Sequence, residues 1–468
     1  MLLHPRPSPL AWRSAPVHGP LHVVRDPEVA APHDLLLDPA FPYGEDLLQF
    51  IWEAQLFDRH GLRTVDGRPV EVLHPGRIQR DAGPDLRDAR LRIGGQEWAG
   101  TVEVHLRSSE WARHGHQHDP AYESVALHVV YEHDAEARTL GGRVLPTVEL
   151  LPRVSTASLS LFAGLLRGRG AVPCAAHLPP AEPGRLHTWL ESVLVERLVR
   201  RTAAAEELYG LLQRDSAALA WHLLCRAFGQ RANAEPFAML AHALPWSVLR
   251  RVRDDAFRVE ALVFGQAGLL QVDFVDEHPR RLQTEHRALA RLHGLRPAPV
   301  AAWTFGRLRP AAFPTVRLAQ LAALVARLGG ELTDLAAAPD VPALRRLLQA
   351  DPAPYWTTHY RFDHTTPPRP KPLGAATVDQ LIINAVVPLL FVLGRARGDQ
   401  ALRDRAIALL EQLPPEHYTV LAQWTERGVA VDSAARGQAL LELQRQYCTP
   451  RRCLSCGFGR HLLRGTRP

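Results

Sequence analysis

Lysine is almost absent from this 468-residue sequence, in which Lys371 is the single example among 55 lysine and arginine residues. The net charge of +6 therefore comes from arginines spread along the whole chain. Such a charge affects solubility and association, and does not by itself indicate a nucleic-acid ligand. Hydrophobic residues make up 46% and charged residues 22% of the chain, which is typical of a globular protein and excludes an intrinsically disordered one.

Long apolar runs are absent as well. Residues 1–20 are rich in proline and arginine and lack the apolar core of a secretory signal. The most apolar stretch, residues 381–394, contains Asn384 and Pro388 and is shorter than the roughly 20 residues that a spanning helix needs. We therefore expect a soluble, cytoplasmic protein with no membrane contact.

The five cysteines are too few for a disulfide scaffold in a chain of this length. Cys448, Cys453 and Cys456 follow the spacing C-x4-C-x2-C, and thiolates this close together are typical of a metal site in a reducing compartment. Both a tetrahedral Zn²⁺ and an iron–sulfur cluster fit three clustered cysteines with one distant ligand. The candidates for that ligand are Cys174, Cys225 and His461. We select Cys174 and expect the site to be structural.

The length of the chain predicts two or three domains. Residues 1–39 are rich in proline without periodicity and are expected to be irregular. Residues 40–155 combine an amphipathic helix at 44–57 with short alternating runs, which predicts an α+β domain with a mixed sheet. Residues 156–468 carry apolar side chains at helical spacing and are expected to form a mostly α-helical region that ends in the cysteine motif.

Strands are predicted where β-branched and apolar residues alternate, with Gly94-Gly95 as a tight hairpin turn. The predicted strands are 69–73, 88–93, 98–106 and 124–131, with 144–150 as a further candidate. The predicted helices beyond residue 180 are 186–213, 217–228, 237–243, 259–270, 318–328, 378–393 and 401–413.

The strongest candidate site lies around this hairpin. Asp85 stands at the start of one strand, and Glu103 lies on the next strand after the Gly94-Gly95 turn. On an alternating strand Glu103, His105 and Arg107 project from one face. Two carboxylates brought together in this way are typical ligands of a hard divalent cation, Mg²⁺ or Mn²⁺.

This arrangement resembles the core of the PD-(D/E)XK nuclease superfamily, in which an Asp at the start of one strand faces a Glu-x-Lys on the next. The resemblance implies a nuclease-like α/β domain and a metal-dependent nuclease or phosphodiesterase acting on DNA or RNA, with Asp85, Glu103 and His105 as its catalytic residues. The sequence departs from the motif at His105, which stands in the place of the lysine. An imidazole there either takes the part of the lysine or ligates a transition metal such as Mn²⁺ or Zn²⁺.

Further candidates surround the central three. Histidines are unusually dense between His105 and His133. His114, His116 and His118 would point to one side of an extended loop and form a plausible set of metal ligands, and of these we select His114 and His118. We also select His128, which lies on an apolar strand and needs a polar partner. The alternative is a solvated loop and a satisfied core histidine. Arg107 would supply positive charge. Glu53 corresponds to the helical carboxylate that many such nucleases carry.

Longer phrases, in order along the chain, resemble an uncharacterised bacterial family of the DUF 2851 type, a domain of unknown function. They include AGPDLRDARLRI, WAGTVEVHLRSSEWARHGH, YESVALHVVYEHD, LIINAVVPL and YCTPRRCLSCGFGRHLL. This resemblance implies no activity, although it also places a histidine at position 105. Besides the nuclease, two alternatives remain: a non-catalytic nucleic-acid-binding or assembly protein on a degenerate nuclease fold, and a metal-dependent hydrolase of small molecules.

Overall fold

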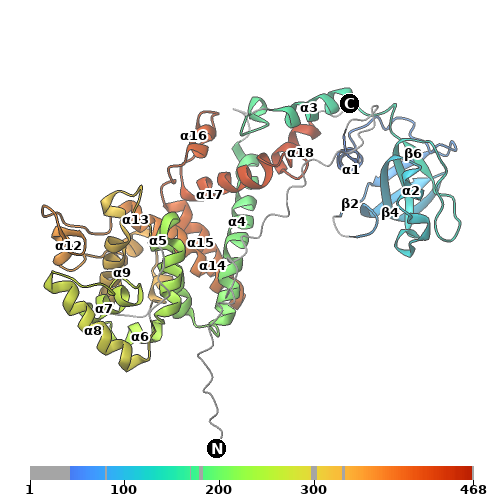
Figure 1. Ribbon diagram of the computed structural model, residues 1–468. Coiled ribbons are helices and arrows are strands. Elements are labelled where there is room, and N and C mark those ends of the chain that lie inside the picture. The colour runs from blue at the N-terminus through green and yellow to red at the C-terminus, as the bar shows by residue number, and fades with distance from the viewer. Residues whose placement is uncertain are drawn as a thin grey trace, which may run out of the picture. The chain divides into compact units, whose positions relative to one another are not determined.

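The computed structural model describes residues 43–79, 82–168, 170–178, 183–296, 303–328 and 332–465. The chain forms two compact units (Figure 1). The sheet unit consists of Met1–His177 together with Gln446–Pro468, and the helical unit of Leu178–Arg445. The segment 1–39, predicted to be irregular, lies outside the described residues, and the predicted domain boundary after residue 155 stays a prediction.

The sheet unit combines one mixed sheet with a few helices, and the helical unit follows it, which confirms the predicted α+β class. Its strands are β1 (Val70–His74), β2 (Arg77–Ile78), β3 (Leu86–Ile93), β4 (Gln96–Arg107), β5 (Val125–Glu132) and β6 (Thr147–Glu149). Its α-helices are α1 (Glu45–Ala54), α2 (Glu110–Arg113), α3 (Thr156–Arg167) and α18 (Gly457–Arg464). Short 3₁₀ turns are η1 (His116–His118), η2 (Pro120–Tyr122) and η3 (Ala175–His177).

The strands lie in the order β1-β3-β4-β5-β6, with β2 paired to β3. The β1–β3 and β3–β4 pairs are antiparallel, whereas β4–β5 and β5–β6 are parallel. Gly94 and Gly95 have φ values of 60° and 89° and form the predicted hairpin turn, a conformation that glycine adopts without steric cost. Because a parallel pair needs a crossover, the chain between β4 and β5 leaves the sheet, and α2, η1 and η2 occupy this connection.

A large hydrophobic core packs α1 against the sheet, and a smaller cluster of Trp111, Val125, Ala137 and Leu145 lies apart from it. The buried face of α1, with Leu48, Ile51 and Trp52, belongs to the same core as Val102 and Val104 of β4. Its apolar residues recur at helical spacing, so one face of the helix is buried against other elements.

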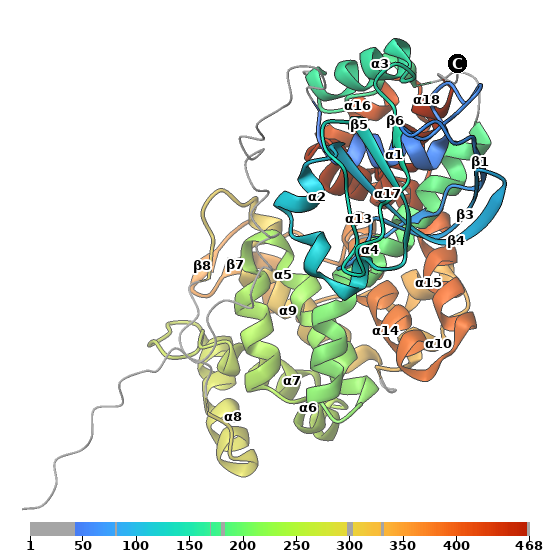
Figure 2. The ribbon, with the colours of Figure 1, turned by 90° about the vertical axis from the view of Figure 1, so that its right-hand side faces the viewer.

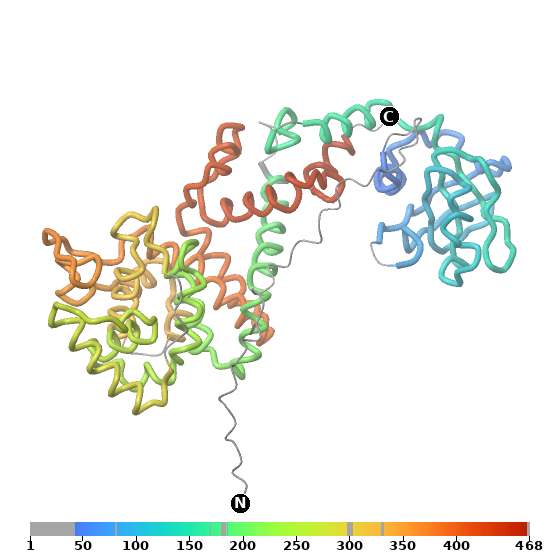
Figure 3. The backbone as a smooth tube through the Cα atoms, in the orientation of Figure 1, coloured from blue at the N-terminus to red at the C-terminus, as the bar shows by residue number. Residues whose placement is uncertain are grey.

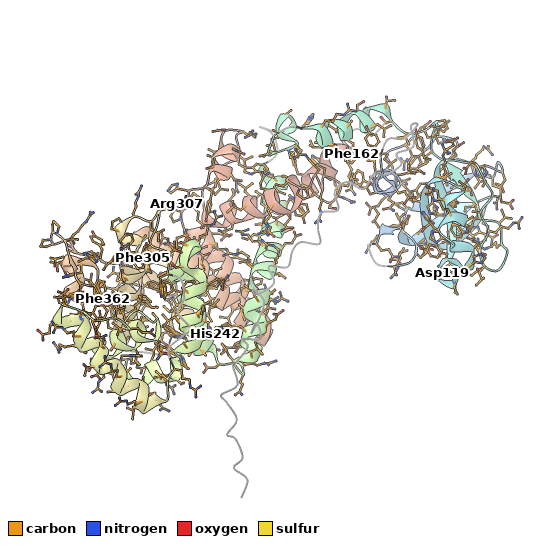
Figure 4. The ribbon with its side chains drawn as sticks, in the orientation of Figure 1. Asp119, Phe162, His242, Phe305, Arg307 and Phe362 are labelled. Atoms are coloured by element: carbon orange, nitrogen blue, oxygen red, sulfur yellow. The ribbon has the colours of Figure 1, made fainter. Side chains whose placement is uncertain are left out.

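The chain end also contributes to this core. Phe162 of α3 and Leu463 of α18 are buried in it, and Figures 1 and 2 show these two helices side by side. Figure 4 labels Phe162, whose ring meets that of Tyr43 edge-on with centroids 5.5 Å apart. The same figure labels Asp119, whose carboxylate accepts the Ala121 N–H at the start of η2.

The helical unit is built from helices that alternate with short connections (Figure 3). Its longer helices are α4 (Pro183–Leu211), α5 (Ser216–Ala243), α7 (Ala256–Gln266), α8 (Glu277–His293), α9 (Pro314–Leu328), α14 (Val387–Arg397), α15 (Gln400–Gln412) and α17 (Ala434–Leu443). Shorter elements are α6 (Trp246–Val252), η4 (Pro310–Ala312), α10 (Asp334–Ala337), α11 (Val341–Leu347), α12 (Tyr355–Thr358), β7 (His359–Arg361), β8 (His364–Thr365), α13 (Ala375–Leu381), η5 (Ile382–Val386) and α16 (Thr419–Thr425). A π-helical turn, η6 (Gln444–Cys448), leads back to the sheet unit.

The two predicted helices, 217–228 and 237–243, both lie within α5 and are separated by a kink. There the backbone of Gln230 and Asn233 leaves the helical region. At the kink the chain packs closely on itself, since a Cβ on Gly229 would lie 2.7 Å from the Ala234 Cα. A glycine and a later proline, Pro236, therefore divide the helix where the sequence pattern was interrupted.

One helical run, Ala375–Arg397, is apolar enough to span a membrane by length and composition alone. It has 23 residues because α13, η5 and α14 continue one another, so it is longer than the stretch 381–394 that we judged too short. Its most apolar window is 72% buried inside the structure. An apolar helix that is mostly buried in this way is typical of the core of a folded domain.

Gly100 provides a test of the β4–β5 register. A Cβ at this position would lie 2.5 Å from the Ser124 carbonyl oxygen, whereas a Cβ on Gly164 of α3 would meet nothing within 4 Å. We expect Gly100→Ala to lower the free energy of unfolding by about 1–3 kcal/mol through overpacking. Gly164→Ala should leave it unchanged or raise it by up to about 1 kcal/mol. Urea denaturation of the two variants measures both, and equal stabilities would contradict the register.

Candidate functional site

The two predicted carboxylates do converge at the β3–β4 hairpin. The Asp85 N–H donates to Glu103 Oε2 at 3.0 Å, and the Val104 N–H donates to Asp85 Oδ2 at 3.0 Å. The register that pairs Leu86 with Val102 brings these groups opposite each other. Each carboxylate is thus held by a backbone donor of the neighbouring strand, so its direction is set by the sheet.

Two further carboxylates lie next to this pair. Glu45, the first residue of α1, is hydrogen-bonded through its side chain to Glu110 and lies in the electrostatic field of Asp85 and Glu103. Glu110, at the start of α2, accepts the backbone N–H groups of Leu106 and Arg107 at 3.0 and 3.2 Å. We call Glu45, Asp85, Glu103 and Glu110 the carboxylate group.

The carboxylate group concentrates negative charge in a poorly solvated place. Burial, followed by the charges of Glu110 and Asp85, raises the pKa of Glu45 to about 8. Burial and the Glu103 charge raise the pKa of Asp85 to about 7, although the Val104 N–H and a hydrogen bond from Gln49 oppose the shift. Neighbouring carboxylates out of water favour protons or cations between them. The group therefore has the electrostatic character of a cation site.

Histidines line the other side of Glu103. The side-chain nitrogens of His105, His114 and His116 lie within 4.8 Å of one another, a spacing that suits three ligands of one metal ion. Glu103 Oε1 lies 3.3 Å from His116 Nε2 and 3.6 Å from His105 Nε2. We call the three residues the histidine group. Glu103 is shared between this group and the carboxylates.

His128 orients the central ring of the histidine group. It stands opposite Glu103 in the parallel β4–β5 pair, and its Nε2 lies 2.9 Å from His105 Nδ1. The opposite nitrogen of His105, Nε2, lies 3.2 Å from His114 Nδ1. If Nδ1 of His105 carries the proton and donates it to His128, the Nε2 lone pair points into the histidine group. A hydrogen bond from the second ring nitrogen in this way fixes the orientation of a metal-ligating histidine.

Both buried imidazoles are neutral at physiological pH. Burial, with added repulsion from the neighbouring histidines, lowers the pKa of His105 to about 2 and that of His128 to about 3. A neutral imidazole is the form that ligates metals. It also carries no positive charge, so His105 does not reproduce the ammonium group of the lysine in the nuclease motif.

Two aromatic side chains enclose the histidine group. Tyr122 stacks on the His116 ring with centroids 3.8 Å apart, and Trp111 meets the rings of His116 and His128 at 5.3 and 5.4 Å. Burial and the charges of Glu103 and Asp85 raise the pKa of Tyr122 to about 12. Tyr122 therefore keeps its phenolic proton and is a potential hydrogen-bond donor beside the carboxylates.

Three predicted supporting residues lie elsewhere. Glu53 pairs with Arg460 and accepts the Ile78 N–H at 3.4 Å, so its carboxylate is bound to the chain end. Arg107 lies at the end of β4, 3.6 Å from Glu132. His118 is exposed.

The expected extended loop is wrong, because residues 110–122 form helical turns. Helical turns do not place alternate residues on one side. His114 and His116 meet because Gly115, at φ 78°, reverses the chain between them.

The sequence did not single out Glu45, Gln49, Glu110 or Tyr122. Glu45 and Gln49 are four residues apart on α1, a spacing that places both on one helix face. This spacing is the sequence signal that would have identified the two residues as a pair. Glu110 and Tyr122 follow no spacing rule, because the crossover between β4 and β5 decides where they lie.

The predicted cysteines come together in the sheet unit. Cys453 belongs to the hydrophobic core of the sheet unit, and Cys174 packs against that core. Cys174 and Cys448 each lie in the electrostatic field of Cys453 and Cys456, so the four thiols share one region of the unit. Cys225 is fully buried in α5 of the helical unit.

A family model described as "Protein of unknown function (DUF2851)" matches residues 45–419, well over half of the chain. The chain belongs to this family. The match to the DUF2851 family begins at Glu45, so it includes every member of the carboxylate and histidine groups, and it ends before Cys448. The family description names no activity. No curated protein and no solved structure matches the chain. The predicted DUF 2851 resemblance is confirmed, and the nuclease resemblance stays a prediction.

The raised pKa of Glu45 predicts how stability depends on pH. Its folded-state pKa of about 8 lies above the ordinary glutamate pKa of 4.5, so the folded protein binds the proton more tightly than the unfolded chain does. This contribution to stability is complete below about pH 4.5 and is lost as the pH rises through 8, with a slope of up to about 1.4 kcal/mol per pH unit.

Urea denaturation of chelator-treated protein between pH 5 and 8 measures this effect. We expect Glu45→Gln to flatten the fall in unfolding free energy, because the amide does not ionise. Glu71→Gln, at an exposed residue of β1, is the matched control and should retain the wild-type slope. A Glu45→Gln profile parallel to that of the wild type would contradict the shift.

Proposed function

We propose that this protein is a metal-dependent hydrolase of phosphodiester bonds, with Asp85 and Glu103 as the central metal ligands. The observation that carries the proposal is the reciprocal backbone bonding that fixes these two carboxylates across the β3–β4 hairpin. Carboxylates held rigidly by the sheet would not need to reorganise when a cation binds.

The order of elements supports the nuclease type. A helix, α1, precedes three antiparallel strands, β1, β3 and β4, and a crossover with short helical turns leads to β5, which is parallel to β4. The PD-(D/E)XK resemblance drawn from the sequence implies this order, with the Asp and the Glu-x-Lys positions on the two strands of the hairpin. Asp85 and Glu103 occupy these places. The chain therefore resembles the superfamily in the order of its helix and strands and in the residues of the sequence motif.

The residues present fit a divalent cation. Oxygen ligands from Asp85, Glu103 and Glu45 suit Mg²⁺ or Mn²⁺, and a cation held there would polarise the scissile phosphate and lower the pKa of the attacking water. Glu45 would exchange its proton for the cation, since a nearby positive charge lowers the pKa of a carboxyl. Gln49 holds Asp85 in place through a side-chain hydrogen bond.

The histidine group suggests how the site works without the lysine. Because His105 is neutral, it would not supply the positive charge that the lysine supplies in the nuclease motif. His105, His114 and His116 would instead hold a second cation of the borderline type, such as Zn²⁺, for which imidazole is a preferred ligand. Glu103 would bridge the two positions, since its Oε1 faces the imidazoles and its Oε2 faces Asp85.

One observation favours a second candidate, a hydrolase of small phosphorylated or acyl substrates. Three histidines, or two histidines with a glutamate, are ligand sets of catalytic zinc sites. Glu103, His105 and His128 are also buried, at 4%, 1% and 0% exposure. A small substrate would reach such residues more readily than a duplex.

Activity assays distinguish these possibilities. Purified protein supplied with Mg²⁺ or Mn²⁺ is tested on single- and double-stranded DNA, on RNA and on bis-p-nitrophenyl phosphate. We expect cleavage that a chelator abolishes, and a fall of about 10²–10³ in rate for Asp85→Asn or Glu103→Gln, because each loses a ligand of the cation.

Glu97→Gln is the matched control, because Glu97 lies on the same strand but is exposed and pairs with Arg92. It should cleave at the wild-type rate. Cleavage of the small ester alone would select the second candidate. Undiminished cleavage by an Asp85→Asn/Glu103→Gln double variant would exclude both.

Metal binding at the histidine group is measured separately, by isothermal titration with Mn²⁺ and Zn²⁺. We expect His105→Gln to weaken binding of the borderline cation by at least about 10–100-fold, the loss seen when even an outer-shell partner is removed. His118→Gln changes an exposed histidine three residues beyond Gly115 and should bind as the wild type does. Equal affinities in the two variants would remove the histidine group from the proposal.

A further inference from the structure

Four of the five cysteines meet at one place in the sheet unit, away from the carboxylate and histidine residues in the sequence. Cys174 directly precedes η3, Cys448 ends η6, and Cys456 is the residue before α18. Cys448, Cys453 and Cys456 are buried, and Cys174 is partly buried against the hydrophobic core. None of the four is joined in a disulfide.

The loop that carries three of these cysteines is held firmly. The Arg451 side chain donates to the Cys448 carbonyl oxygen at 2.8 Å, and it also donates to the carbonyl oxygens of Gly168 and Gly170, shortly before Cys174. One guanidinium therefore joins the two segments that supply the thiols. The segments are about 280 residues apart in sequence.

Close packing fixes the rest of the loop. The backbone N–H of Cys456 donates to the carbonyl oxygens of Arg452 and Cys453. A Cβ on Gly459 of α18 would lie 2.3 Å from the Cys453 carbonyl oxygen, so the helix approaches the loop to a distance that only glycine permits. Such turns place thiols in fixed directions and are typical of metal-ligating loops.

We propose that Cys174, Cys448, Cys453 and Cys456 bind one metal centre through four thiolates, and that this centre ties the segment 448–464 to the segment 168–177. The number and spacing of the thiols carry the inference. A single buried cysteine packs as a small apolar residue, as Cys225 does in α5. Four neighbouring thiols from two distant segments do not improve packing over alanine or valine, but they complete a tetrahedral ligand set.

Positive charge lies beside the thiols. The Arg451 guanidinium donates to the Cys448 carbonyl oxygen, and Cys456 stands at the N-terminus of α18, where the helix dipole stabilises negative charge. A centre with four thiolates is anionic, so these positive contributions would offset its charge. Four thiolates are a ligand set of both Zn²⁺ and the [4Fe–4S] cluster, so the site suits either metal centre.

The test uses the full chain, expressed with both zinc and iron supplied and purified anaerobically without chelator. Elemental analysis and visible absorption identify the metal, and we expect about one zinc ion or about four iron ions per chain at this site. Cys174→Ser and Cys453→Ser should each lose at least half of that metal. Cys225→Ala is the matched control and should keep it.

A measurement on the unaltered protein covers the case in which the serine variants fail to fold. A mercurial reagent that blocks thiols should release the metal in proportion to the cysteines modified, with complete release at four. Metal bound only by Glu103 and His105 would resist this reagent and would disappear in a His105→Gln variant, so the failure of one site is distinguishable from the failure of the other. Purified protein without thiol-sensitive metal, or with a disulfide among the four cysteines, overturns the inference.

Discussion

The reciprocal hydrogen bonds across the β3–β4 hairpin are the constraint on which the candidate site depends. The Asp85 N–H holds Glu103 and the Val104 N–H holds Asp85, so each carboxylate is aligned by the backbone that carries the other. The parallel β4–β5 register then places His128 opposite Glu103, and His128 in turn sets the direction of the His105 ring. A shift of register by one residue would turn Glu103 and His105 to the other face of the sheet.

Charge is the second constraint, and it acts in opposite directions on the two sides of Glu103. On one side, burial and mutual repulsion favour the protonated forms of Glu45 and Asp85. On the other side, burial keeps His105 and His128 neutral. Both effects reduce the charge that the fold must bury, and both leave lone pairs that a cation is able to use. The proposed metal-binding function would account for the gathering of so many ionisable groups in one unit despite the cost of burying them.

The end of the chain belongs to the sheet unit and is held there by several independent contacts. Arg460 of α18 pairs with Glu53 of α1 and lies over the Phe50 ring, and Leu463 is part of the hydrophobic core. Glu53, which we selected from the sequence as a site residue, therefore holds α18 against the helix that carries Glu45. The proposed cysteine centre would reinforce the same closure, because its ligands come from both segments.

The sequence by itself determined the fold class, the strands of the hairpin, the turn at Gly94-Gly95, and the convergence of Asp85 with Glu103, because alternation and turn chemistry are local signals. It also indicated that Cys174 would join the C-terminal cysteines. Tertiary contacts alone show that Glu45 and not Glu53 faces the carboxylates. They also show that of the three predicted loop histidines His114 and His116 lie beside His105, and that Tyr122 stacks on His116. These choices depend on the packing of α1 and on the crossover between β4 and β5, and contacts between segments distant in the chain leave no periodic pattern within either segment.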